Sequence, residues 1–456
     1  GVVVLSARSA FPMSPALRSL CLRWRGSAMA APLLASLYDE EVRTLPDPVV
    51  VAERRVESEP ALARWDAGMI ELVSPRTIDE LLATEPSFSL YRRQSALFGN
   101  PTTSGVSLRR TGATAASRTL VLRDGIPQND PFGGWVSWAR YHPELLSSAR
   151  LVPAAQSAAW GNQSPAGVVQ LTTRVPRVSG ARIGVTAGSD GTWGGSLGAD
   201  LVSRDGSVAA QLAGFTLQSD GFHGLRKSQR GSVDRRLDLD TRGAEGRLVW
   251  RPSGDLSVEP AFSYYEEERG NGTRLARNES EALDLSLRVT GERPEGTWQA
   301  LVYYQRRDFE ALFSSVAADR HSERPALDQF DVPGEGVGGG WTATLVQGDQ
   351  HDLFLGADLR YLQGETNENA GFVDGSFLRR RRAGGDQFLG GAFLRSAHRL
   401  DQGTAVDASL RLDFWALRDG ERVERRPSTG ALLREEDFPD REGFEPSLSL
   451  ALRHPL

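Results

Sequence analysis

From residue 178 onward the chain alternates apolar and polar residues with a period of two. The stretches 283–289, 406–414 and 448–453 show the pattern clearly; in the first, Leu285 stands between Asp284 and a serine. Successive side chains of a β-strand point to opposite faces, so each stretch predicts a strand with one apolar and one polar face. Charged side chains cannot line a dry core unpaired, which favours a barrel with a wet interior. A soluble sandwich with the apolar face inward is the alternative.

The lengths of the connections separate these two folds. The pattern predicts twelve strands, near 181–189, 192–203, 206–219, 235–251, 255–266, 279–290, 296–308, 335–347, 351–363, 386–399, 403–418 and 443–453. After the first hairpin, short turns alternate with long loops near 220–234, 267–278, 309–334, 364–385 and 419–442. Short turns at one end and long loops at the other are typical of outer-membrane barrels. Two aromatic girdles are also expected, from Trp250 and Trp298 near short turns and from Tyr264, Tyr265, Tyr303 and Tyr304 nearer the opposite ends.

The region before residue 178 is organised differently. Residues 75–82 predict a short helix with Ile78, Leu81 and Leu82 on one face, which we interpret as core packing.

The most informative stretch is 118–131, where an apolar strand runs directly into a turn. Asp124 and Gly125 offer the positive φ that a tight reversal needs, and Pro127 and Pro131 stop the backbone from pairing onward.

This stretch resembles the plug domain of TonB-dependent outer-membrane receptors, in which a strand ends in Asp-Gly-Val/Ile-Pro followed by Asn. Further similarity, upstream at 106–112 and downstream at 157–174, extends the resemblance over residues 72–176 in the right order. The signature positions are Arg109, Gly112, Asp124, Gly125, Pro127, Asn129, Asp130, Gly161 and Gly167. Arg110 and Pro153 stand where the family has glycine, which is expected to alter the local turns.

The resemblance implies a mainly β protein, with a small α+β plug domain over 57–176 and an antiparallel transmembrane β-barrel over 177–456. It implies an outer-membrane transporter that imports a scarce nutrient, with a ferric siderophore as the first expectation and cobalamin as the next. No catalysis and no cofactor are expected. The implied partners are the TonB protein with its inner-membrane energising complex, outer-membrane lipid and the nutrient.

Two other classes of function remain open. A binding-only outer-membrane receptor or adhesin would keep the barrel without transport. A secreted β-rich hydrolase would need a converging Ser/His/Asp set or carboxylate pair, which the plug sequence does not offer.

A segment at 45–56 resembles the TonB box, the short strand that pairs with TonB, and its linker. The box consists of Asp47, Pro48, Val49, Val50, Val51 and Ala52. Three consecutive valines flanked by prolines and charges make an extended segment suited to strand addition at a partner's sheet edge. The alternative is an ordinary first strand of the plug. Residues 1–44 are interpreted as a signal or upstream segment.

In the resembled plugs, apical loops meet the cargo, and they correspond here to 97–105 and 132–141. The second holds the candidate ligand-binding residues Trp135, Trp138, Arg140 and Tyr141. Aromatic rings with a cation suit a large, partly apolar, anionic ligand. Packing of the tryptophans between the plug and the barrel wall is the equal alternative.

Composition narrows the remaining choices. The chain has no run of 18 apolar residues, which excludes a transmembrane helix but not a membrane barrel. A net charge of −6 argues against nucleic acid as a partner. Cys21 is the only cysteine, and the six histidines show no ligand spacing, so no metal site is predicted.

Two short glycine motifs match enzyme signatures, G-x-S-x-G at 194–198 and G-x-G-x-x-G at 334–339. Both lie in predicted strands and lack the following helix that each signature requires.

The strand count also leads to an expectation about the extent of the chain. Family barrels have about 22 strands, against the twelve predicted here. We therefore expect a fragment that forms an open half-barrel, in which the strands near 181–189 and 443–453 do not pair.

Overall fold

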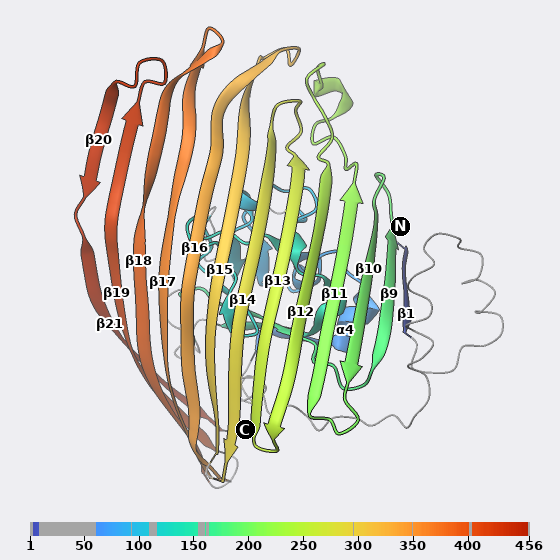
Figure 1. Ribbon diagram of the computed structural model, residues 1–456, viewed down its shortest axis with the longest axis vertical. Helices are drawn as coiled ribbons and strands as arrows, with labels where there is room; N and C mark the ends of the chain where they lie inside the picture. Colours follow the sequence, from blue (N-terminus) through green and yellow to red (C-terminus); the bar gives the residue numbers. More distant parts are fainter. Residues whose placement is uncertain are drawn as a thin grey trace, which may run out of the picture.

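The computed structural model describes residues 61–92, 94–108, 116–153, 160, 164–294, 296–348, 350–400 and 404–454, and the backbone of residues 3–8. Figure 1 shows a tall, curved antiparallel sheet with a small domain behind its middle strands. None of the helices in these ranges is long and apolar enough to cross a membrane.

The large sheet follows chain order, with each strand from β9 to β19 antiparallel to the next. Its strands are β9 (Gly180–Ala187), β10 (Trp193–Val202), β11 (Val208–Ser219), β12 (Leu239–Ser253), β13 (Leu256–Gly270), β14 (Arg277–Arg293), β15 (Gly296–Val316), β16 (Glu323–Gln347), β17 (His351–Val373), β18 (Ser376–Arg399) and β19 (Ala405–Arg425). Two shorter strands, β20 (Leu432–Phe438) and β21 (Arg441–Arg453), pair with successive parts of β19 and so act as one further strand. The twelve strands predicted from the alternation are therefore confirmed.

The sheet stays open among the described strands. At one edge, β9 pairs with β1 (Val3–Arg8), a strand in the segment that was interpreted as a signal or upstream sequence. At the other edge, β21 pairs with β19 and with no other described strand. The first and last predicted barrel strands do not pair, in agreement with the half-barrel expectation.

The two faces of the sheet differ as the alternation predicts. In β14, Leu285 is 44% exposed on the outer face, whereas the neighbouring Asp284 is 6% exposed on the face that meets the small domain. The outer face carries a band of exposed apolar residues that includes Ile183, Leu197, Leu212, Leu248, Leu287, Val302, Leu359 and Leu412. The predicted tyrosine girdle is wrong for Tyr265 and Tyr303, which are buried on the inner face. Because the period is two, only Tyr264 and Tyr304 can face outward beside them.

The two ends of the sheet are unequal, but the predicted long loops are mostly strand. Residues 309–334 belong to β15 and β16 except for the turn at 317–322, and 364–385 belongs to β17 and β18 except for residues 374–375. The hairpins therefore rise well above the small domain, and the short turns lie at the lower end in Figure 1. In β17 and β18 the extensions are mainly polar on both faces, which removes the apolar alternation. In β15 and β16 they also carry apolar residues that are buried on the inner face, Phe309, Ala311 and Val332.

The small domain contains a five-stranded sheet with the order β2-β7-β8-β5-β6, in which β5 and β8 are parallel. These strands are β2 (Ala63–Asp66), β5 (Leu120–Arg123), β6 (Ile126–Pro127), β7 (Leu146–Pro153) and β8 (Gly167–Thr173). A separate pair, β3 (Phe88–Leu90) and β4 (Val106–Leu108), lies beside two helices, α4 (Ala67–Val73) and α5 (Ile78–Leu82). Short 3-10 helices occur at η1 (Pro101–Thr103), η2 (Trp138–Arg140) and η3 (Pro143–Leu145), and in the large sheet's upper loops at η5 (Lys227–Gln229).

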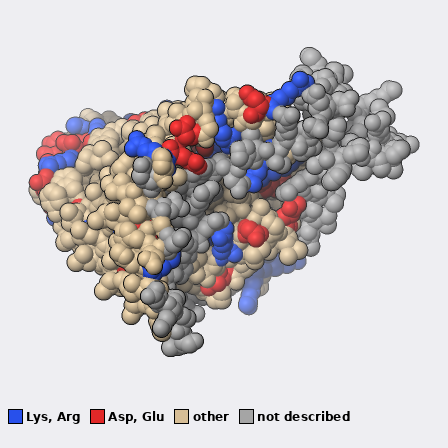
Figure 2. Space-filling view, turned by 90° about the horizontal axis from the view of Figure 1, so that it is seen from below, with Lys and Arg blue, Asp and Glu red and all other residues tan. Residues whose placement is uncertain are grey.

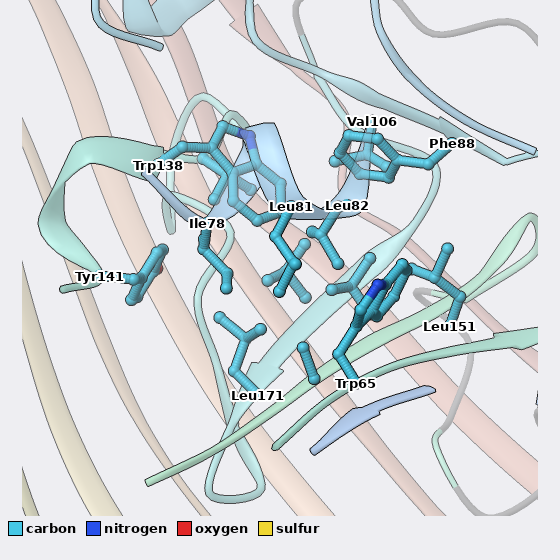
Figure 3. Packing of buried hydrophobic residues seen from close by; sticks show 14 of the residues in the cluster. Trp65, Ile78, Leu81, Leu82, Phe88, Val106, Trp138, Tyr141, Leu151 and Leu171 are labelled. Carbon is cyan, nitrogen blue, oxygen red and sulfur yellow. The ribbon is translucent and has the colours of Figure 1, made fainter. Parts of the chain in front are cut away.

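Helix α5 is the helix predicted over 75–82, shortened to five residues. Its three predicted apolar residues are fully buried, and they pack with Trp138 and Phe88 in the core (Figure 3). Helix α4 was not predicted from the sequence. It begins at Ala67, directly after its N-cap residue Asp66, whose carboxylate accepts a hydrogen bond from the Met69 amide at 2.8 Å. Only Ile70 of this helix is buried, so the helix has too little apolar periodicity to reveal itself.

Replacing a buried leucine of α5 should destabilise the small domain far more than replacing an exposed leucine of α4. Leu81→Ala removes a fully buried side chain and is expected to lower the free energy of unfolding by about 2–5 kcal/mol, because a cavity remains. Leu72→Ala in α4, where the side chain is 85% exposed, is the matched control and should change stability by less than about 0.5 kcal/mol. Urea unfolding followed by tryptophan fluorescence measures both. Equal stabilities of the two variants would contradict the assigned core.

The same core holds an unusual carboxylate. Asp79 of α5 is buried, and its Oδ2 accepts a hydrogen bond from the Ala96 amide at 2.9 Å. Burial raises the pKa of Asp79 to about 6, because the apolar surroundings disfavour the ionised form. The folded state therefore binds a proton more tightly here than the unfolded chain does. Stability is expected to fall as pH rises from about 4 to about 6.

Asp79→Asn should remove that fall, since an amide keeps the acceptor for Ala96 without titrating. We expect the wild type to lose about 2–3 kcal/mol of unfolding free energy between pH 4 and pH 6.5 relative to the variant. Asp205→Asn, in a fully exposed turn whose carboxyl has its pKa lowered to about 2 by hydrogen bonds from Ser203 and Ser207, should keep the wild-type slope. Parallel curves for wild type and Asp79→Asn would show that Asp79 is not buried as described.

Candidate functional site: the contact between the small domain and the sheet

The site is built around a two-residue turn that joins β5 to β6. Asp124 has φ 51° and Gly125 has φ 80°, the pair of positive values that a tight hairpin of this type requires. A side chain at Gly125 would be strained by that φ, and its Cβ would meet Leu301 of β15 at 3.5 Å. The turn predicted from sequence is thus present, and its tip rests on the wall of the large sheet, where Ile126 packs against Leu301 and Tyr303.

The Asp124 carboxylate joins the small domain to the wall. Its oxygens accept hydrogen bonds from the amide, at 2.8 Å, and the hydroxyl of Thr173 in β8. One of them also forms an ion pair with Arg247 of β12 at 2.5 Å. Arg288 of β14 donates to the main-chain carbonyl of Asp124. Burial alone would raise the pKa of Asp124, but Arg247 and Arg288 outweigh it and hold the pKa below its usual range.

Two more ion pairs cross the same contact. Arg123 of β5 pairs with Glu245 of β12, and Arg140 of η2 pairs with Asp284 of β14 at 2.5 Å. Arg307 of β15 binds the other oxygen of Asp284 at 2.6 Å. All these side chains are at most 10% exposed. The contact is therefore charged and buried at once.

Two free-energy costs describe the behaviour of such a contact, that of removing one charge and that of separating both. Removing one partner of a buried ion pair leaves an uncompensated charge and costs roughly 3–5 kcal/mol. Separating both partners into water costs far less, because hydration of the two charges replaces most of their mutual attraction. The contact therefore fixes the position of the small domain on the large sheet. It still allows the two to separate, because water then hydrates the charges.

The space left in the contact is small. A cavity of about 50 Å³ lies between the turn and the wall, lined mainly by polar and charged residues that include Arg123, Asp124, Glu245, Arg247 and Arg288. Pockets for small-molecule ligands typically measure 300–1,000 Å³. A ligand of that size does not fit into this cavity while the turn stays in place.

The other predicted signature residues shape the turn region. The Asn129 side chain accepts from the Val121 amide at 2.9 Å and donates to the Thr119 carbonyl. Asp130 accepts from the amides of Phe132 and Gly133 at 3.0 and 2.7 Å. The carbonyl of Pro127 accepts a hydrogen bond from Gln305 of β15 at 2.8 Å, and Gly167 has φ 119°. Arg109, Arg110, Gly112, Gly161 and the segment 47–52 lie outside the described residues.

The four candidate ligand residues hold the small domain together or against the wall. Trp138 is 1% exposed and donates to the Ser104 carbonyl at 3.4 Å. The Tyr141 hydroxyl donates to Gln128 at 3.0 Å, and Trp135 packs on Phe309 of β15 with ring centres 5.3 Å apart. Trp135 and Arg140 thus contact the wall, whereas Trp138 and Tyr141 pack within the small domain. A contact of these residues with cargo stays a prediction.

The role of the wall residues in this site was not predicted from the sequence. Glu245, Arg247, Asp284, Arg288 and Arg307 occupy inward positions on β12, β14 and β15. Charges of both signs at inward positions of neighbouring strands were a usable signal, but their partners in the turn lie more than 100 residues away.

Asp124→Ala tests the contact. The variant strands Arg247 without its carboxylate and should weaken attachment of the small domain by about 3–5 kcal/mol. Adding Arg247→Ala should cost less than the sum of the two single changes, because the stranded charge is then gone. Asp205→Ala in the exposed turn after β10 is the control and should behave like wild type. Protease susceptibility of the small domain in mild urea reports the attachment, and additive effects of Asp124→Ala and Arg247→Ala would argue against their coupling.

Comparisons with known proteins agree with this geometry. Residues 61–168 match the family model "TonB-dependent Receptor Plug Domain". No curated protein sequence shows significant similarity to the chain.

Solved structures share the fold over most of the chain. The copper transporter OprC superposes with a TM-score of 0.70 at 18% identity, covering 88% of this chain and 63% of that one. The ferric yersiniabactin uptake receptor FyuA from Yersinia pestis gives 0.67 at 13% identity, covering 85% and 61%. The ferric-catecholate import receptor Fiu from E. coli K12 gives 0.64 at 11% identity, covering 85% and 65%. The chain thus spans under two thirds of the length of these structures.

The small domain at 61–168 is therefore a TonB-dependent receptor plug domain, and the chain that carries it has the fold of the TonB-dependent outer-membrane receptors.

Proposed function

We propose that the protein acts in the outer membrane as a TonB-dependent importer of a scarce nutrient. The observation that carries the proposal is the plug held against the inner face of the sheet by buried ion pairs around Asp124. Such a plug closes the passage at rest, and its polar contact can be opened and remade. The apolar outer face of the sheet suits outer-membrane lipid.

In this proposal the pull enters through residues 47–52, which add as a strand to the TonB protein, itself driven by its inner-membrane energising complex. The first described strand after that segment is β2, which lies at the edge of the plug sheet and pairs only with β7 among the described strands. An edge strand can be drawn away without first breaking the pairs between β7, β8 and β5. Force would then reach Asp124 through β8 and Thr173.

A ferric siderophore is the proposed cargo, with cobalamin as the second candidate. The proposal draws support from the structurally similar ferric yersiniabactin and ferric-catecholate receptors, although another similar structure is a copper transporter. No catalysis is proposed. The two enzyme-like glycine motifs lie inside strands β10 and β16, where neither a nucleophile elbow nor a phosphate loop can form.

The alternative function is a binding-only outer-membrane receptor or adhesin. It shares the sheet and the plug but has no use for a segment that binds TonB. Binding of TonB therefore separates the two functions.

Val50→Pro tests the coupling. Proline removes an amide donor and should lower affinity for the purified C-terminal domain of TonB at least tenfold, because an added strand needs its main-chain hydrogen bonds. Ser58→Pro, outside the proposed box, is the control and should bind like wild type. In cells, Val50→Pro should abolish uptake of labelled ferric siderophore while leaving surface binding intact. If Val50→Pro binds TonB normally, the importer proposal fails and the binding-only receptor is favoured.

A further inference from the structure

Two histidines from neighbouring strands meet at the short-turn end of the sheet. His351 is the first residue of β17, and His398 is the last but one of β18. The register makes them direct partners. Their Nδ1 atoms lie 3.1 Å apart, and their ring centres are 4.2 Å apart with the planes tilted by 36°. Both strands reach this end at the bottom of Figure 1.

The backbone explains the close approach. The Arg399 amide donates to the Gln350 carbonyl at 2.8 Å, so the adjacent pair, His351 and His398, is of the non-hydrogen-bonded type. In that type the Cα atoms are about 4.5 Å apart and the side chains are at their closest. The sheet therefore holds the two rings together before any ligand arrives.

The spacing of the nitrogens suits a shared metal ion. Imidazole nitrogens bind zinc at about 2.0–2.1 Å, which places two such nitrogens on one ion roughly 3 Å apart. On the far side of the His398 ring, the Ser396 hydroxyl lies 2.9 Å from Nε2. A hydrogen-bond partner on the second nitrogen is what orients a metal-binding histidine and fixes its tautomer.

We propose that His351 and His398 form a binding site for a divalent transition-metal ion, held through the two Nδ1 atoms. Imidazole ligands suit copper, nickel and zinc, and the general order of affinities puts Cu²⁺ first. This site is separate from the plug contact and does not depend on the import function.

The residues around His351 and His398 show which further ligands a bound metal ion could use. In the described part of the chain no cluster of three or more His, Cys, Asp or Glu residues is placed to hold a metal, so water or an outside donor completes the coordination. Asp352 is engaged by Arg399 at 2.5 Å. Seen from below, this end of the molecule shows acidic and basic side chains interspersed (Figure 2). The two imidazoles, and not a general acidic field, must supply the affinity.

A hydrogen bond between two neutral rings would also fit a nitrogen separation of 3.1 Å. The experiment must therefore detect metal on both rings. Electron paramagnetic resonance of the full chain in detergent, loaded with one equivalent of Cu²⁺, should show coupling to two imidazole nitrogens. A spectrum with one nitrogen or none would overturn the proposal.

Calorimetric titration with Cu²⁺ supplies the affinity. His398→Gln should weaken binding about a hundredfold, because the second imidazole no longer adds intramolecularly. Ser396→Ala should weaken it about tenfold through loss of ring orientation. His454→Gln is the matched control: its ring bonds Thr404 at 2.8 Å at the same end of the sheet, and its loss should leave the affinity unchanged. Equal Cu²⁺ affinity of wild type and His398→Gln, with circular dichroism showing both folded, would refute the site.

Discussion

The fold depends on a set of buried ion pairs that fasten a small domain to the inside of a curved sheet. Asp124 and Arg123 at one hairpin, and Arg140 nearby, each meet an opposite charge on the wall. Charged residues occupy the inner face because each strand alternates, and the plug meets them there with complementary charges. The apolar outer face and the charged inner face are thus two consequences of one period-two pattern.

The core of the plug and its contact with the wall are packed differently. The core around α5 is apolar and fully buried, so it keeps the plug folded as a unit. The contact with the wall has only small apolar clusters, such as Ile126 with Leu301 and Tyr303, beside its ion pairs. Charges regain hydration when they separate, whereas an apolar core gains nothing from water. The weaker boundary therefore lies between the plug and the wall.

Prediction from sequence worked where a local rule is strict. The alternation located the twelve strands, and the Asp124–Gly125 pair located a turn whose two positive φ values the structure contains. It failed where the deciding contact is distant in sequence. Arg247 is 123 residues from Asp124, and His351 is 47 residues from His398, so spacing along the chain could reveal neither pair. It also failed where a strand is mainly polar on both faces, as in the hairpin extensions of β17 and β18. It failed again at Asp79, because a hydrophobic pattern does not predict the burial of a carboxylate.

A disulfide across the plug contact tests the central claim most directly. Ile126→Cys and Leu301→Cys would be combined with Cys21→Ser, which removes the only native cysteine. Ile126 and Leu301 pack together across the boundary, so oxidation should join the plug to the wall. The account predicts that uptake of labelled nutrient stops on oxidation and returns on reduction, while surface binding persists in both states. Undiminished uptake by the fully oxidised protein would show that the plug need not leave the wall, and would contradict the account.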